Sequence, residues 1–137
     1  MKFIYQELEI EPTPATTRKK LVYRPIIPVI LICGKSVVGY LAVVDSGSDY
    51  CVFESKVADY LGIKLTSGNK RAIRGISGEP IKGYEHKIIF KIAGKQYKTK
   101  VIFSKQIPPN SFGVLGNQGF FDHFKVTFKY PKYIEVA

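Results

Sequence analysis

Residues 43–49 of this chain, Val43-Val44-Asp45-Ser46-Gly47-Ser48-Asp49, join an apolar run to an acid, a small hydroxyl residue, a glycine and a second serine. An aspartate at the end of a buried strand has to leave the strand ladder to reach solvent or a partner. Gly47 allows the backbone to turn sharply there, and the Ser46 hydroxyl can bond a backbone group. Taken alone, the same residues also fit an ordinary strand-to-turn junction, because Asp, Ser and Gly are favoured in turns.

The segments on both sides of this stretch predict short β-strands. Ile26 to Cys33 is a β-branched apolar run, residues 37–44 form a second one, and we expect a hairpin that turns between them near Gly34. Alternating apolar residues flank Ala93-Gly94-Lys95 and predict a second hairpin, and residues 124–128 and 133–136 flank Pro131. Many short strands with turns between them predict an all-β fold, a small closed β-barrel-like domain.

Helix signals are few, and they predict one or two short helices. Ser55 can cap a helix that runs to Leu61 and stops at Gly62, and residues 116–123 are a candidate for a second helix. Residues 2–11 alternate weakly and predict an edge strand, whereas residues 12–20 hold two prolines and no large apolar residue, which indicates a linker. We therefore expect residues 1–20 to be an N-terminal edge strand and linker and residues 21–137 to be the packed domain.

The composition is that of one soluble domain with a strong positive charge. The 137 residues include 21 Lys and Arg against 11 acids, a net charge of +10, and 45% of them are hydrophobic, which excludes disorder as the main state. No apolar run reaches the ~20 residues that a membrane helix needs, and we expect no signal peptide because charge appears early. Cys33 and Cys51 lie among apolar residues. We interpret them as buried free thiols in a reducing, cytoplasmic compartment.

Four short motifs resemble, in order and spacing, those of the retropepsin-like aspartic proteases. Asp45-Ser46-Gly47-Ser48 resembles the active-site loop of the family, and Val114-Leu115-Gly116 resembles the apolar-apolar-Gly signature whose strand threads behind that loop. Arg74-Gly75-Ile76-Ser77-Gly78 is similar to the glycine-rich flap tip of a retroviral protease, and Arg24-Pro25 to the Arg-Pro that opens the retropepsin core. The resemblance covers about residues 24 to 128. It implies a single-lobe acid-protease fold that cleaves a peptide or protein substrate.

The number of catalytic acids is an independent constraint. Aspartic-protease chemistry needs two carboxylates that share a proton, and the other aspartates, Asp49, Asp59 and Asp122, lack an Asp-Ser/Thr-Gly context. One chain therefore supplies one catalytic carboxylate, that of Asp45, and we expect a C2 homodimer with Asp45 from each subunit at the two-fold axis. A water held between the two carboxyls attacks the peptide bond, and no metal or cofactor is required.

The resemblance also implies roles for the residues around Asp45. In the catalytic loop, Ser46 would bond across the dimer axis and Gly47 would shape the turn, while Asp49 would pair with Arg24 of the other subunit. Asn117 departs from the pattern, because many retroviral proteases have arginine there. Residues 70–86 would form a mobile flap with Ile76 at its tip. The substrate-binding residues that the resemblance implies are Ser48, Asp49, Val52, Ile73, Gly75, Ile76, Phe112 and Val114, with Val43 beside them.

For the apolar residues among these, and for Val52 above all, plain core packing is the alternative to substrate binding. Ser48 stands where retropepsins often have alanine, and its hydroxyl can donate to the outer oxygen of Asp45. Such a bond favours the charged form of the carboxyl, which predicts the highest activity at acidic pH.

Other function classes find less support in the sequence. Lys87, Lys91, Lys98 and Lys100 are most simply the solvated faces of a hairpin, and nucleic acid is not the expected partner because Tyr97 lies on the face opposite its neighbouring lysines. His86 and His123 lack the spacing of metal ligands, and no Gly-x-Ser-x-Gly motif is present. The serious alternative is a non-catalytic peptide-binding or assembly module of the same fold. The intact Asp45-Ser46-Gly47 favours the protease.

Overall fold

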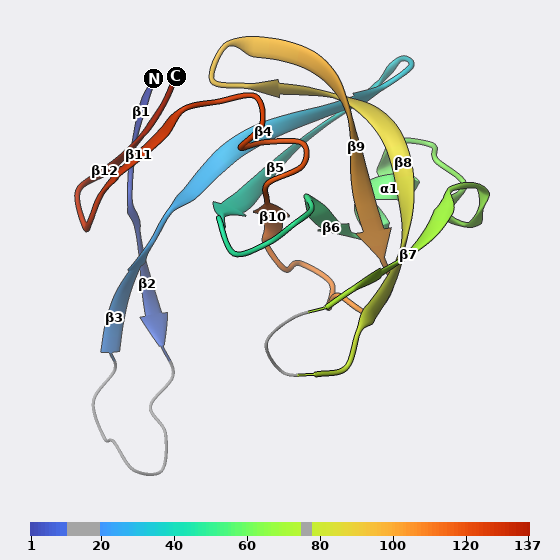
Figure 1. Ribbon diagram of the computed structural model, residues 1–137, viewed down its shortest axis with the longest axis horizontal. Helices are drawn as coiled ribbons and strands as arrows, with labels where there is room; N and C mark the ends of the chain where they lie inside the picture. Colours follow the sequence, from blue (N-terminus) through green and yellow to red (C-terminus); the bar gives the residue numbers. More distant parts are fainter. Residues whose placement is uncertain (11–19, 75–77) are drawn as a thin grey trace.

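The chain folds almost entirely into β-strands, which confirms the all-β prediction. The computed structural model describes residues 1–10, 20–74 and 78–137. Within them one short α-helix, α1 (Ser55–Tyr60), and one 3-10 turn, η1 (Leu65–Ser67), are present (Figure 1). The strands are β1 (Lys2–Ile4), β2 (Gln6–Ile10), β3 (Lys20–Arg24), β4 (Ile26–Cys33), β5 (Ser36–Val44), β6 (Val52–Glu54), β7 (Asn69–Ile73), β8 (Ile81–Ile92), β9 (Lys95–Ser104), β10 (Gly113–Leu115), β11 (Val126–Lys129) and β12 (Tyr133–Val136).

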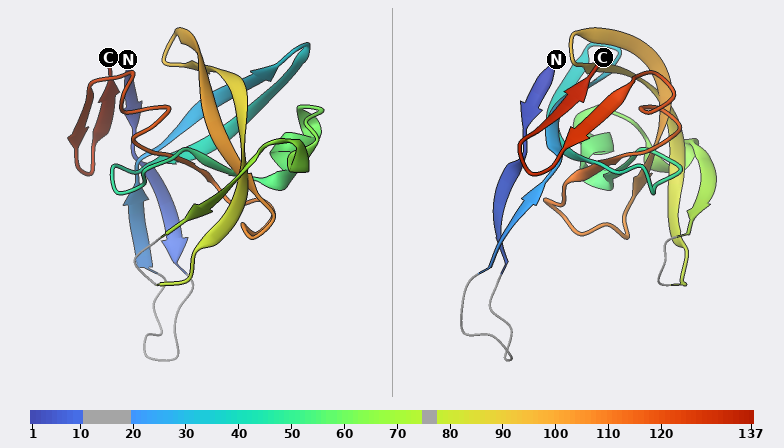
Figure 2. Two further views of the ribbon diagram at one scale, coloured as in Figure 1. Left: turned by 45° about the vertical axis from the view of Figure 1, so that its right-hand side comes forward. Right: turned by 60° about the vertical axis from the view of Figure 1, so that its left-hand side comes forward.

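A closed barrel carries the predicted hairpins. Seven strands form one sheet in the order β4-β5-β10-β6-β9-β8-β7, and an additional pairing of β4 with β8 closes six of them into a ring. The β4–β5 hairpin turns at Gly34, whose φ of 58° suits glycine. The β8–β9 hairpin turns at Ala93 and Gly94, both with positive φ, as a two-residue type I′ turn requires. Figures 1 and 2 show the strands curving around a common centre.

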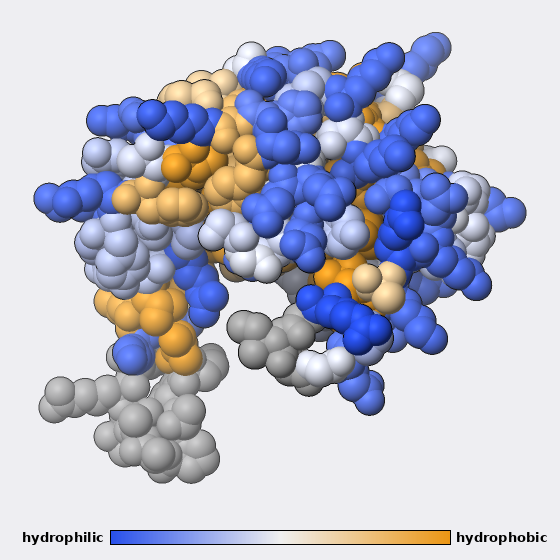
Figure 3. Space-filling view, viewed as in Figure 1, coloured by the Kyte–Doolittle hydropathy of each residue, from blue (hydrophilic) through white to orange (hydrophobic). Residues whose placement is uncertain are grey.

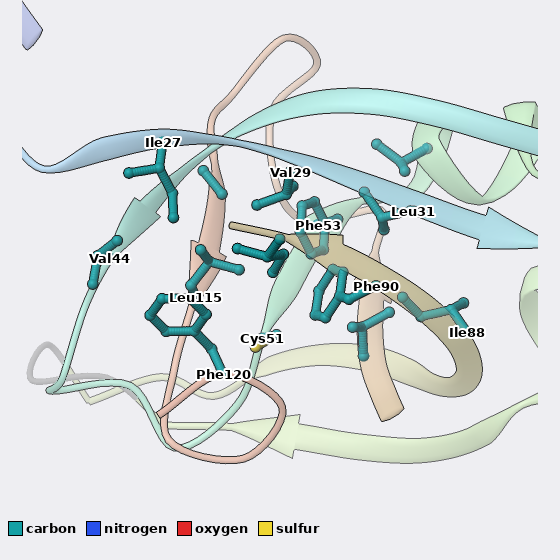
Figure 4. Close-up of a cluster of buried hydrophobic side chains, with 14 of the residues drawn as sticks. Ile27, Val29, Leu31, Val44, Cys51, Phe53, Ile88, Phe90, Leu115 and Phe120 are labelled. Atoms are coloured by element: carbon teal, nitrogen blue, oxygen red, sulfur yellow. The ribbon is translucent and has the colours of Figure 1, made fainter. Parts of the chain in front are cut away.

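Apolar side chains from facing strands fill the barrel. Phe53, Phe90 and Phe103 are fully buried, and the ring centroid of Phe53 lies 6.0 Å from that of Phe90 and 6.4 Å from that of Phe103. Figure 4 shows Val29 and Leu31 of β4 beside Phe53 and Phe90. Burying each such ring stabilises the fold by about 1.5–3 kcal/mol, so this core is a main support of the strands that carry Asp45.

The N-terminal residues differ from the single edge strand that we expected over residues 2–11. β1 pairs with β12, which also pairs with β11, whereas β2 pairs with β3 in a two-stranded ribbon that extends away from the barrel (Figure 2). Two strands form because Tyr5 leaves the ladder between them and turns into the core, where it is 8% exposed. Lys20, which we placed in the linker, begins β3. The rest of the predicted linker lies outside the described residues, and the domain boundary after residue 20 stays a prediction.

One of the two predicted helices is present. α1 stops at Gly62 as expected: Gly62 has a φ of 71°, and the amides of Gly62 and Ile63 donate to the carbonyls of Asp59 and Ala58 at 3.0 and 2.9 Å, a Schellman ending. The start differs by one residue, because Glu54 rather than Ser55 occupies the N-cap position. Within the described part of the chain, no helix is long and apolar enough to cross a membrane.

The predicted helix over residues 116–123 is wrong. The segment forms turns, in which the amides of Phe121 and Asp122 donate to the carbonyls five residues earlier, Gly116 and Asn117. Gly119 explains the difference. Its φ of 108° does not fit a helix, and its amide donates to Oδ1 of Asp122 at 3.0 Å.

Candidate active site

Asp45 is an exposed residue at the end of β5, and two neighbouring segments hold it there. The amide of Asp45 donates to the carbonyl of Leu115 at 2.9 Å, in the adjacent parallel strand β10, and the amide of Val44 donates to the carbonyl of Pro25 at 2.8 Å. The amide of Gly47 donates to Oδ1 of Asp45 at 2.9 Å. The backbone therefore presents the Asp45 carboxyl to solvent in a defined orientation.

The turn after β10 clamps the loop that follows Asp45. The amides of Asn117 and Gln118 donate to the carbonyls of Ser48 and Asp49 at 2.8 and 2.9 Å, which continues the strand pairing beyond β10. Gly116 lies directly against the loop. A Cβ at this position would meet the carbonyl oxygens of Tyr50 and Ser48 at 2.3 and 2.5 Å. This approach requires glycine, and it explains why the Val114-Leu115-Gly116 strand lies behind the Asp45 loop as we expected.

The hydroxyl of Ser48 does not bond Asp45 as we predicted. Its Oγ donates to the carbonyl of Tyr50 at 2.8 Å, and a hydroxyl has only one proton to donate. The local turn wins because the Tyr50 carbonyl lies two residues away on the same loop. Ser48 therefore stabilises the loop from within, and it gives no reason to expect the highest activity at acidic pH.

The structure brings together several of the predicted substrate-binding residues. Val43 and Val114 are register neighbours on β5 and β10 and are half-buried, and Phe112, 38% exposed, precedes the same strand β10. Val52 pairs with Val114 but is only 5% exposed. Its burial favours core packing, the alternative for this residue.

β7 and β8 pair antiparallel within the segment that we expected to form the flap, and the pairs run from Asn69 with Glu85 to Ile73 with Ile81. Ile73 is half-buried at the end of β7. Gly75 and Ile76 lie outside the described residues, so their roles at the tip stay predictions, as does the mobility of the flap. Arg24 and Asp49 are both exposed, and their pairing between subunits also stays a prediction.

The half-buried Tyr40 and the buried Glu54 lie near the site, and the sequence did not suggest them. The hydroxyl of Tyr40 donates to the carbonyl of Ser111 at 2.7 Å, next to Phe112. Burial, followed by the negative charge of Glu54, raises the pKa of Tyr40. Glu54 is 4% exposed, and its Oε2 has no hydrogen-bond partner among the described residues. Tyr40 occupies an ordinary alternating position of β5, so no sequence signal marked it.

The cysteines and histidines have structural surroundings. Cys51 is fully buried, whereas Cys33 is half-buried, so the prediction of two buried thiols is confirmed in full only for Cys51. Burial raises the pKa of Cys51 to about 12. His86 lies 2.7 Å from the carbonyl of Leu65, and His123 stacks on Tyr97. In residues 1–10, 20–74 and 78–137, no group of three acidic, His or Cys side chains could hold a metal ion.

Comparisons with known proteins give matches among solved structures. No protein-family model and no curated protein sequence matches the chain. A retropepsin-like aspartic protease from Rickettsia conorii superposes with a TM-score of 0.61 at 18% identity, over 100% of this chain and 94% of that chain. The fold is retropepsin-like. EIAV protease, in a complex with the inhibitor HBY-793, matches with a TM-score of 0.50 at 22% identity, over 69% of this chain and 82% of that chain. In this retropepsin-like lobe, Asp45 is exposed at the end of β5, and hydrogen bonds to β10 and to the turn after it hold its loop.

Proposed function

We propose that the protein is an aspartic endopeptidase, in which two copies of the chain each contribute Asp45 to a catalytic dyad. The observation that carries this proposal is the exposed Asp45 carboxyl, which the amide of Gly47 and the carbonyl of Leu115 orient at the end of β5. A surface acid in an ordinary turn does not need a glycine-only contact such as that of Gly116 beneath its loop. The half-buried Val43 and Val114 beside it suit apolar substrate side chains.

In this mechanism, two carboxyls about 3 Å apart share one proton because they cannot both ionise. The charged carboxylate takes a proton from a bound water, whose oxygen forms a bond to the scissile carbonyl carbon. The protonated carboxyl donates its proton to the carbonyl oxygen, which gives a neutral gem-diol. The C–N bond then breaks as the first carboxyl gives the proton that it took from water to the leaving nitrogen, while a gem-diol hydroxyl returns its proton to the second carboxylate and the carbonyl re-forms.

A mixing experiment with Asp45→Asn tests the dyad directly. Wild-type and Asp45→Asn chains are unfolded, mixed in equal amounts and refolded together, and cleavage of an apolar peptide is measured with and without pepstatin. If both carboxyls are needed, only wild-type pairs cleave, so about one quarter of the activity of an all-wild-type sample remains. Asp59→Asn, which removes an exposed acid of α1, is the matched control and should leave activity unchanged.

The outcomes separate the two candidate functions. About half of the activity after equal mixing would show that single chains act alone and would overturn the dyad. Equal cleavage by undiluted wild-type and Asp45→Asn protein would remove Asp45 from the chemistry. Tight peptide binding without any cleavage would favour the peptide-binding module of the same fold.

A further inference from the structure

A groove lies on the outside of the barrel at the end of β5 far from Asp45. Ile32 and Cys33 of β4 and Ile89 of β8 provide apolar side chains along a concavity of about 570 Å³. These three residues are half-buried, so each still offers apolar surface to an occupant. The volume falls in the range of small-ligand and peptide side-chain pockets.

Lysines line the same groove. Lys87 of β8 and Lys98 and Lys100 of β9 are exposed, and hydrophilic side chains gather where β8 and β9 lie in the space-filling view (Figure 3). Lys87 is the register partner of Lys100, and Lys98 that of Ile89. Like charges directly opposite each other on a sheet are destabilising, so an anionic occupant would relieve a repulsion that the sheet itself maintains.

Glu85 of β8, the neighbouring acid, neutralises little of the positive charge of these lysines. Its Oε1 lies 3.2 Å from Arg71 and 4.0 Å from Lys100, so Arg71 is its nearer partner. Among the residues that the structure describes, no salt bridge involves Lys87 or Lys98. With a net charge of +10, the whole molecule further attracts anions.

We propose that this groove binds an extended acidic segment of a partner protein, with an apolar side chain against Ile32 and Ile89 and carboxylates on Lys87 and Lys98. The groove is a concavity, which suits a peptide better than a membrane surface. Base stacking has no platform here, because Tyr97 points inward and donates to the carbonyl of Gly119 at 2.7 Å. Neither Asp45 nor any residue of its loop lines the groove, so the proposed site is separate from the candidate active site.

Binding is measured with a fluorescein-labelled peptide of eight residues that alternates glutamate and leucine. The double variant Lys87→Glu/Lys98→Glu should weaken binding roughly tenfold or more. Lys129→Glu/Lys132→Glu, at exposed positions near the C-terminus, changes the net charge equally and should retain most of the affinity. Bound peptide should also slow alkylation of Cys33 in the groove, whereas the buried Cys51 reports any unfolding.

Further probes distinguish the occupants. A peptide with glutamine in place of glutamate, and a peptide of glutamate alone, should each bind less well than the alternating one. Equal weakening by both lysine double variants, or an unchanged rate of Cys33 alkylation, would overturn the site. Tighter binding to phosphatidylserine vesicles or to a single-stranded oligonucleotide, lost in Lys87→Glu/Lys98→Glu, would overturn the peptide in favour of that ligand.

Discussion

The hydroxyl of Tyr40 in β5 bonds the carbonyl of Ser111 at 2.7 Å, across a sequence separation of 71 residues. The bond ties the segment that leads to Phe112 to a strand of the barrel. Phe112 is a predicted substrate-binding residue, so under the proposed function Tyr40 would act as a positioning residue for it. The charge of the buried Glu54 contributes to the raised pKa of Tyr40, so a change at Tyr40 also alters the surroundings of this carboxyl.

Tyr40→Phe should lower the free energy of unfolding by about 1–3 kcal/mol, because it leaves the Ser111 carbonyl without its donor. Amide hydrogen exchange of residues 110–112 should accelerate, and KM for peptide cleavage should rise more than kcat falls. Tyr97→Phe is the matched control, since it loses a similar bond to Gly119. The two variants should lose similar stability. Equal exchange at residues 110–112 in both would remove Tyr40 from its positioning role.

Gly116→Ala should disrupt the Asp45 loop. The new methyl would stand 2.3 Å from the Tyr50 carbonyl oxygen, and backbone atoms cannot move aside cheaply, so we expect a loss of about 3 kcal/mol in urea unfolding. Gly39→Ala is the comparison within β5, because a Cβ at Gly39 would meet no atom within 4 Å. It should be neutral or slightly stabilising. Equal stability of the two variants would show that the loop yields easily.

Ser48→Ala should leave the acid limb of the cleavage rate profile in place. The Ser48 hydroxyl bonds the Tyr50 carbonyl rather than Asp45, so its removal costs loop stability, about 1 kcal/mol, without a direct effect on the carboxyl. The profile of rate against pH, measured for both proteins with one peptide, checks this. An upward shift of the acid limb by a full pH unit in Ser48→Ala would contradict this assignment and show that Ser48 bonds Asp45 in the active protein.

The buried Cys51 makes stability depend on alkaline pH. Burial raises the pKa of its thiol from 9.0 to about 12. At pH below 9 the thiol is protonated in both the folded and the unfolded chain, and its contribution to the free energy of unfolding is fully present. Between about pH 9 and 12 the unfolded thiol ionises while the folded one does not. The free energy of unfolding should then fall, approaching about 1.4 kcal/mol per pH unit.

Urea unfolding at pH 8, 9 and 10 measures this slope. Cys51→Ala should reduce the slope of stability against pH, although the smaller side chain also lowers stability at every pH by leaving a cavity. Cys33→Ala, at the half-buried thiol, should leave this slope unchanged. Parallel curves for wild type and Cys51→Ala would show that another group is responsible for the alkaline loss.

The sequence predicted the parts of the fold that local chemistry determines. The hairpins at Gly34 and Ala93-Gly94 follow from turn residues with positive φ between apolar runs, and the stop of α1 follows from Gly62. The helix predicted over residues 116–123 failed because Gly119 and Asp122 form a local turn that a periodic pattern does not reveal. The split of residues 2–10 into two strands depends on long-range pairing with β12, which no local signal contains.

In the candidate site, too, the sequence predicted what local chemistry determines and missed what depends on the folded chain. Gly116 could be predicted because its backbone lies so close to the Asp45 loop that only glycine fits, whereas Gly47 has no positive φ that would require glycine. Ser48 was assigned the wrong acceptor, since a hydroxyl can reach several oxygens and only the folded loop selects one. Tyr40 escaped prediction because its partner Ser111 is distant in sequence.

β12 has β1 on one side and β11 on the other, so its own rows of N–H and C=O groups are fully committed within the chain. A second copy can extend this sheet only along the outer edge of β1 or β11, which are 3 and 4 residues long. Edges of this length supply few inter-chain hydrogen bonds. The proposed dimer would therefore gain few hydrogen bonds from this sheet, and the cleavage rate per chain would decline on dilution.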